Sequence, residues 1–182
     1  MVAAGGGLAR LAGLLRAEGG LMATLVAPTS ANGNGAHAEE SPALIAAQGP
    51  RAEGRREEYE LLIEAIYEGY LLHYGRPRVV RVPEADLCLL AGDHLYAIGL
   101  ARLVSLGDTL AVAELADTIT LSALAQGAGE HALAGAVWTA GARAVGWGPS
   151  DAHQHAKDLL LDGAPGAIDA MRTSAAAVPA PP

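Results

Sequence analysis

The sequence has 182 residues, of which 51% are hydrophobic and 18% charged, and 12 basic residues against 20 acidic ones give a formal net charge of −8. This acidity argues against a nucleic-acid partner, because binding to phosphates requires a basic surface. The single cysteine, Cys88, excludes a disulfide within the chain. No stretch approaches about 18 consecutive strongly apolar residues, so we expect no membrane span. The first residues lack the basic charge of a secretory signal, and we therefore expect a cytoplasmic protein.

The abundance of leucine and alanine predicts an all-α protein, because both residues favour helices. Residues 1–26 are expected to hold a short helical segment, with a helix over 8–26 that Gly19 and Gly20 interrupt. Residues 27–56 contain proline, glycine and small polar residues, and are expected to be a polar linker. The Ala/Pro-rich tail, 174–182, is expected to be disordered.

Between these segments we expect one helical domain over residues 57–173. Glycine and proline residues divide it, because glycine favours helix ends and proline favours helix starts. The predicted helices span residues 57–74, 84–106, 109–127 and 130–145, with weaker ones over 151–161 and 165–173.

An acidic stripe runs along the first of these helices. At 100° per residue, Glu57, Glu60, Glu64 and Glu68 fall within about 80° of one another. One interpretation is a solvated acidic edge beside a tyrosine-rich face that packs in the core. The other is that Glu64 and Glu68, one turn apart, hold a divalent metal ion and face a groove.

Three motifs around this stripe resemble those of the trans-prenyl diphosphate synthases. Residues 64–68 read Glu-Ala-Ile-Tyr-Glu where that family has Asp-Asp-x-x-Asp, and residues 73–77 read His-Tyr-Gly-Arg-Pro where it has Arg-Arg-Gly-x-Pro. Residues 89–95 read Leu-Leu-Ala-Gly-Asp-His-Leu, which is similar to the family's Leu-Ala-Gly-Asp-x-Leu. The resemblance implies a helical bundle like the first half of the isoprenoid synthase fold.

Departures from the family concern its charged residues. Its reaction needs several Mg²⁺ ions that bridge two acidic clusters to a diphosphate leaving group. Here the first cluster is reduced to Glu64 and Glu68, and the candidate for the second is Asp158 with Asp162, for which a simple helix end is the alternative. The family's paired cations are replaced, although Arg76 and Arg78 offer a substitute diphosphate-binding site, or else belong to an ordinary solvated segment.

Three functional hypotheses follow. The first is a degenerate prenyl-synthase-like protein of isoprenoid metabolism, either a non-catalytic subunit or a module that binds an isoprenoid diphosphate. The second is an active prenyltransferase, in which Glu64 and Glu68 hold Mg²⁺ and Arg76 and Arg78 hold diphosphate. The third is a helical interaction protein with only ancestral likeness to the family.

Residues 84–127 are the expected interface with a partner. The segment from Thr109 to Gly129 carries only two charges, Glu114 and Asp117, and is otherwise apolar or small on nearly all sides. A helix of this kind is normally buried. The resemblance implies a homodimer, or a heteromer with a related prenyl synthase, through the same segment.

Overall fold

The computed structural model describes residues 6–28 and 41–176, and in these residues the chain is all-α, as predicted. The elements in chain order are α1 (Gly6–Glu18), α2 (Gly20–Leu25), α3 (Pro42–Gln48), the 3₁₀ turn η1 (Pro50–Ala52), α4 (Arg56–Tyr74), α5 (Ala85–Ser105), α6 (Thr109–Gly127), α7 (His131–Trp147), α8 (Asp151–Leu161) and α9 (Ala167–Ala176). An isolated antiparallel bridge joins Val26 to Val80.

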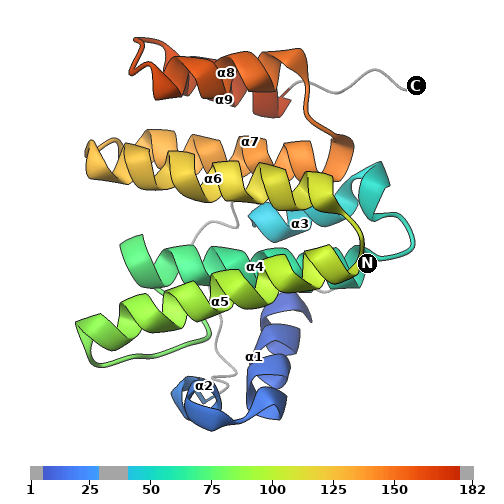
Figure 1. Ribbon diagram of the computed structural model, residues 1–182, viewed down its shortest axis with the longest axis vertical. Helices are drawn as coiled ribbons and strands as arrows, with labels where there is room; N and C mark the ends of the chain where they lie inside the picture. The colour runs from blue at the N-terminus through green and yellow to red at the C-terminus, as the bar shows by residue number, and fades with distance from the viewer. Residues whose placement is uncertain (1–5, 29–40, 177–182) are drawn as a thin grey trace.

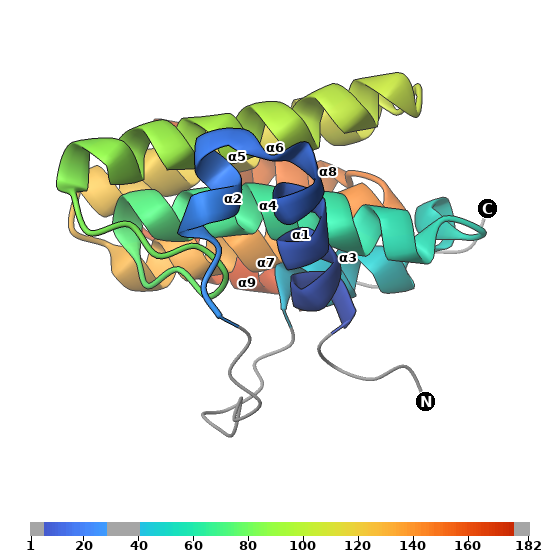
Figure 2. The ribbon, with the colours of Figure 1, turned by 90° about the horizontal axis from the view of Figure 1, so that it is seen from below.

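Pairs of helices form layers that are stacked along the long axis of the molecule (Figure 1). The α8–α9 pair forms one end, followed by the α6–α7 pair and then the α4–α5 pair. Helix α3 packs between α4 and α7. At the other end, α1 and α2 lie across the α4–α5 layer, as the view from below shows (Figure 2).

The four long helices lie close to their predicted positions because polar caps and glycines fix their ends. The side chain of Asp108 accepts a hydrogen bond from the Ala111 amide and starts α6. The side chain of Ser150 does the same for α8 through the His153 amide. Gly129 has a φ of 77°, a backbone conformation that favours glycine and separates α6 from α7.

The N-terminal region differs from the prediction in part. The expected helix over 8–26 is interrupted at Gly19, as predicted, and forms α1 and α2; Gly19 has a φ of 74°. Part of the expected polar linker over 27–56 is helical, because it contains α3 and η1. The hydroxyl of Ser41 caps α3 by accepting from the Ala43 amide, and Pro42 occupies the first helical position. Residues 29–40 of that linker lie outside the described residues, as do residues 177–182 of the expected tail. Residues 174–176 of that tail are not disordered but form the end of α9, where Ser174 is buried.

Glycines allow α4 and α5 to pack closely along most of their length. A Cβ atom on Gly99 of α5 would lie 2.3 Å from Ile66 of α4, and one on Gly69 of α4 would lie 2.8 Å from the carbonyl oxygen of Gly92 on α5. Side chains at these positions would push the helices apart. The small residues therefore set the spacing of this layer.

Helix α5 leaves much of its apolar surface uncovered. By length and composition alone it could cross a membrane, since its most apolar window has a mean hydropathy of 1.4, and 28% of that window is buried. Leu89, Leu90 and Val104 are 48%, 65% and 57% exposed. The expectation that no segment spans a membrane therefore stays a prediction.

Candidate functional site

The two glutamates predicted to bind metal lie inside the protein. Glu64 and Glu68 are one turn apart on α4, and they are 3% and 0% exposed. They face segment 78–80, which bends back toward α4 after the end of that helix. The expected side-by-side placement of the two carboxylates is therefore present, but the surroundings are protein rather than open water.

The carboxylate of Glu68 is surrounded by donors from that segment. Its Oε1 atom accepts hydrogen bonds from three consecutive backbone amides, those of Arg78 at 2.7 Å, Val79 at 2.6 Å and Val80 at 3.1 Å. Its Oε2 atom lies 3.3 Å from Nε of Arg78. A buried carboxylate with this many donors is compensated for its loss of hydration.

Glu64 shares the same guanidinium. Its Oε2 atom lies 2.5 Å from a terminal nitrogen of Arg78, and its Oε1 atom accepts a hydrogen bond of 2.8 Å from the hydroxyl of Ser41. The guanidinium of Arg78 also lies 5.0 Å from the ring centroid of Tyr67, a cation–π distance. One arginine thus bridges both glutamates and an aromatic ring.

This arrangement leaves little room for the predicted metal and diphosphate roles. Arg78, predicted to bind diphosphate, is bound to the two residues predicted to bind metal. Arg76, in the same segment, is exposed. A metal ion at Glu64 and Glu68 would have to displace Arg78 and break hydrogen bonds to the backbone. In the described residues, no group of three or more His, Cys, Asp or Glu side chains is placed to hold a metal ion.

A third buried glutamate of the stripe extends the site toward the N-terminus, although it was not among the predicted metal ligands. Glu60 is 6% exposed; its Oε1 atom accepts from the Gly7 amide at 2.9 Å and its Oε2 atom from Arg10 at 2.9 Å. Glu57 forms the outer end of the stripe, with a side chain that is 79% exposed. The buried glutamates of α4 therefore bind hydrogen-bond donors from α1, Ser41 and segment 78–80. Helical periodicity alone does not reveal these donors, because they are distant in the sequence.

The acids considered for a second metal cluster lie far from the first. Asp158 is on α8 and Asp162 follows at its C-terminal end, and both are exposed. Figure 1 shows that the α6–α7 layer separates α8 from α4. The two acidic pairs therefore do not face one another across a common space.

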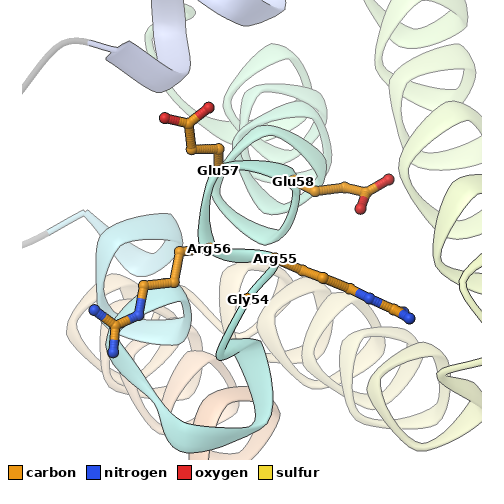
Figure 3. Close-up of a pocket in the computed structure, with 5 residues that line it drawn as sticks. All are labelled: Gly54, Arg55, Arg56, Glu57 and Glu58. Atoms are coloured by element: carbon orange, nitrogen blue, oxygen red, sulfur yellow. The ribbon is translucent and has the colours of Figure 1, made fainter.

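An open hollow of about 430 Å³ lies at the N-terminal end of α4 and is lined by residues 54–58. Figure 3 shows that the side chains of Arg55, Arg56, Glu57 and Glu58 extend in different directions. The two arginines do not converge on one point, so the hollow offers no concentrated charge for a ligand.

Comparisons of this chain with protein-family models, with curated proteins and with solved structures find no match. The resemblance to trans-prenyl synthases therefore rests on the three motifs in the sequence.

Proposed function

We propose that this chain is a non-catalytic, prenyl-synthase-like helical protein that acts as a subunit or interaction module. The observation that carries the proposal is the occupation of Glu64 and Glu68 by Arg78 and by backbone amides. Ionisation of an allylic diphosphate depends on metal ions that neutralise the leaving group. A guanidinium that already neutralises the carboxylates favours a structural role for the motif.

The separation of the two acidic pairs supports the same proposal. A catalytic site of this chemistry needs both acidic clusters to face one bound diphosphate. Asp158 and Asp162 lie in the layer of α8, beyond the α6–α7 layer as seen from α4. Without a second cluster, Glu64 and Glu68 would hold at most a single, partly neutralised metal site.

The test is an assay with Mg²⁺ and labelled allylic and homoallylic diphosphates, run with this protein alone and with a related full-length synthase. We expect no product from this protein alone, whereas the synthase alone provides the positive control. Mg²⁺-dependent product that is lost in Glu64→Gln would contradict the proposal and favour the active prenyltransferase.

A matched measurement separates structural from metal-binding roles. If Glu68 holds segment 78–80, Glu68→Gln should lower the melting temperature equally with and without Mg²⁺. If Glu68 binds metal, the variant should lose only the part of the stability that Mg²⁺ adds. Glu57→Gln, an exposed acid on the same helix, is the control for the change of charge.

A regular exposed stripe on α5 favours association with a second copy of the chain. Leu90, His94, Ala97, Ala101 and Val104 are all exposed and follow the alternating four- and three-residue spacing of a coiled-coil seam. The views in Figures 1 and 2 place α5 and α6 together on one side of the stack, with α4 and α7 behind them. The stripe is therefore on an outer face, where a second helix can reach it.

The order of side chains along the stripe fits an antiparallel copy of α5. Ala97 lies midway between Leu90 and Val104, so a two-fold axis at Ala97 would place Leu90 of each copy against Val104 of the other. The two alanines at the centre, Ala97 and Ala101, allow the helix backbones to approach closely. The same axis places His94 of each copy next to the small side chain of Ala101 of the other, so that a larger side chain faces a smaller one on each side of the axis.

Light scattering at micromolar concentration tests this part of the proposal, and we expect a dimer. A stable monomer would contradict it. A monomer that instead floats with phospholipid vesicles would contradict it too, and would assign the stripe of α5 to a lipid surface.

A further inference from the structure

A second group of buried charged side chains joins α6 to α8, in a part of the molecule that the proposed function does not use. Glu114 of α6 is 6% exposed, and His153 and Lys157, one turn apart on α8, are 4% exposed each. Glu114 Oε2 lies 2.7 Å from Lys157 Nζ and 3.2 Å from His153 Nε2. One buried carboxylate therefore faces two nitrogen atoms of the neighbouring helix.

Two further groups complete the surroundings. Asp117 of α6, whose side chain is 55% exposed, places its Oδ2 atom 2.8 Å from Lys157 Nζ at the rim. From α9, the hydroxyl of Ser174 lies 3.5 Å from His153 Nδ1 and donates to the carbonyl oxygen of Met171 at 2.8 Å. Helix α7 contributes apolar side chains, including Leu133 and Val137, to the core beneath α8 and α9.

The set of Ser174, His153 and Glu114 has the residue types of a nucleophile, base and carboxylate, but its geometry is structural. The Ser174 hydroxyl is already bound to its own helix, and Ser174 is only 5% exposed. A substrate carbonyl could not reach that oxygen unless α9 separated from α8. The polar groups therefore hold three helices together.

The ionised state of the cluster depends on its mutual contacts. Burial by itself would raise the pKa of Glu114, but the close contacts with His153 and Lys157 outweigh burial and hold that pKa below its ordinary range. Burial would lower the pKa of Lys157, yet its bonds to Asp117 and Glu114 raise it overall. The negative charge of Glu114 and the positive charge of Lys157 thus stabilise each other.

We propose that Glu114, His153 and Lys157 form an acid-sensitive latch that fastens the α8–α9 hairpin to α6. When Glu114 takes up a proton, the Lys157 ammonium loses its buried counter-charge and keeps only Asp117, at the exposed rim. A buried ammonium without its carboxylate partner destabilises the packing of α8 on α6. Asp117, at the rim, can pair with Lys157 but is not in contact with His153.

The sign of the effect follows from the direction of the pKa shift. A glutamate whose pKa is lowered in the folded state stabilises that state above its ordinary titration range. The stabilisation begins to be lost as the pH falls below about 4.3, where unperturbed glutamates take up protons. It is lost completely once the pH falls below the lower pKa that Glu114 has in the folded protein. The α8–α9 hairpin should therefore open in acid before the α4–α5 layer does, exposing the apolar side chains of α7.

Amide hydrogen exchange followed by mass spectrometry tests the latch, with protection factors of α8 and α9 compared with those of α4. In the unmodified protein we expect protection of α8 and α9 to fall by about tenfold or more between pH 7 and pH 3.5, while α4 keeps its protection. Glu114→Gln, which imitates the protonated acid, should show the same loss at pH 7. Asp117→Asn, a neutralised acid at the exposed rim, should change protection by less than about twofold.

A replacement of the whole cluster sharpens the test. The triple variant Glu114→Leu, His153→Leu and Lys157→Met has no buried charge to lose, and its α8 should stay protected at pH 3.5. Unchanged protection of α8 in Glu114→Gln at pH 7 would overturn the latch. So would an unmodified protein whose α4 and α8 lose protection together in acid, a result that remains available even if a variant fails to fold.

Discussion

Helices α4 and α5 pack against each other, yet they distribute their side chains in opposite ways. Helix α4 buries three acids, Glu60, Glu64 and Glu68, whereas α5 exposes large apolar residues such as Leu90 and Val104. The acids of α4 are matched by donors that arrive from other parts of the chain. For Leu90 and Val104 of α5, the described part of the chain provides no such cover.

The contrast shows that whether a side chain is buried depends on the groups available to contact it, and not on its polarity alone. A buried carboxylate is stable when cations and amides satisfy it, and an exposed apolar stripe is the surface to which we assign the proposed second copy. Changes on α4 should therefore act on stability, and changes on the stripe of α5 should act on association.

The largest effect is expected from Glu68→Ala. Removal of this carboxylate leaves three backbone amides without their acceptor in the interior and leaves the Arg78 guanidinium with Glu64 as its one remaining carboxylate, which we expect to cost about 3–5 kcal/mol of unfolding free energy. Urea unfolding measures the change. Glu57→Ala, at the exposed end of the same stripe, should change stability by about 0.5 kcal/mol or less. Equal effects of the two variants would contradict the distinction between buried and exposed acids on α4.

The close contact between the two helices gives the next effect. A methyl group on Gly99 would overlap Ile66, so Gly99→Ala should destabilise by about 1–3 kcal/mol. Gly135 of α7 has open space around it, and Gly135→Ala should stabilise by about 0.5–1 kcal/mol because alanine favours a helix. Thermal unfolding of both variants measures the difference, and a neutral Gly99→Ala would show that α4 and α5 are not tightly packed.

A smaller, pH-dependent effect is expected where the turn after α5 meets the start of α4. Asp108 is bound by the Tyr59 hydroxyl, the Ala111 amide and Arg51; burial would raise its pKa, but these contacts lower it overall. Its contribution is therefore present above the ordinary aspartate range and lost as the pH falls. Asp108→Asn should cost about 1–2 kcal/mol at pH 7.

That cost should shrink below about pH 3.9, where unperturbed aspartates take up protons and the unmodified protein begins to lose the same contribution. Urea unfolding at pH 7, 5 and 3 follows the change. A difference between the two proteins that is constant over this range would mean that Asp108 acts through its shape and not through its charge.

The smallest effect on stability, and the largest on association, is expected from Leu90→Glu. Leu90 is 65% exposed, so the substitution should change unfolding free energy by about 0.5 kcal/mol or less. It places a charge in the proposed α5 seam and should convert a dimer into a monomer in light scattering. Leu161→Glu, at a 60% exposed leucine of α8, is the control that should leave the assembly unchanged.

The sequence predicted the positions of the long helices but not the residues that their side chains contact. The positions of glycine and proline predicted the ends of α4 to α7 to within about two residues. Helix α3 was missed because it is short and lies between prolines, although Ser41 followed by Pro42 is a usual helix start. Residue spacing put Glu64 and Glu68 on one face of a helix, but only the folded chain shows that segment 78–80 turns back onto them.

The same limit applies to α8. Spacing shows that His153 and His155 point in different directions, and His153 is indeed buried while His155 is exposed. The partner of His153 is Glu114, nearly forty positions earlier in the chain, which no local pattern could indicate. Buried ion pairs between distant helices thus belong to the part of a structure that sequence periodicity leaves open.

Lys157 is the only lysine in the sequence, and its side chain is 5% exposed. Its amine is engaged by two carboxylates, so it is a poor nucleophile toward acylating reagents as long as α8 stays in place. Amine-directed conjugation should therefore leave this side chain unmodified in the folded protein. The rate at which Lys157 is acylated, measured from the mass of its peptide, should therefore report how often α8 opens.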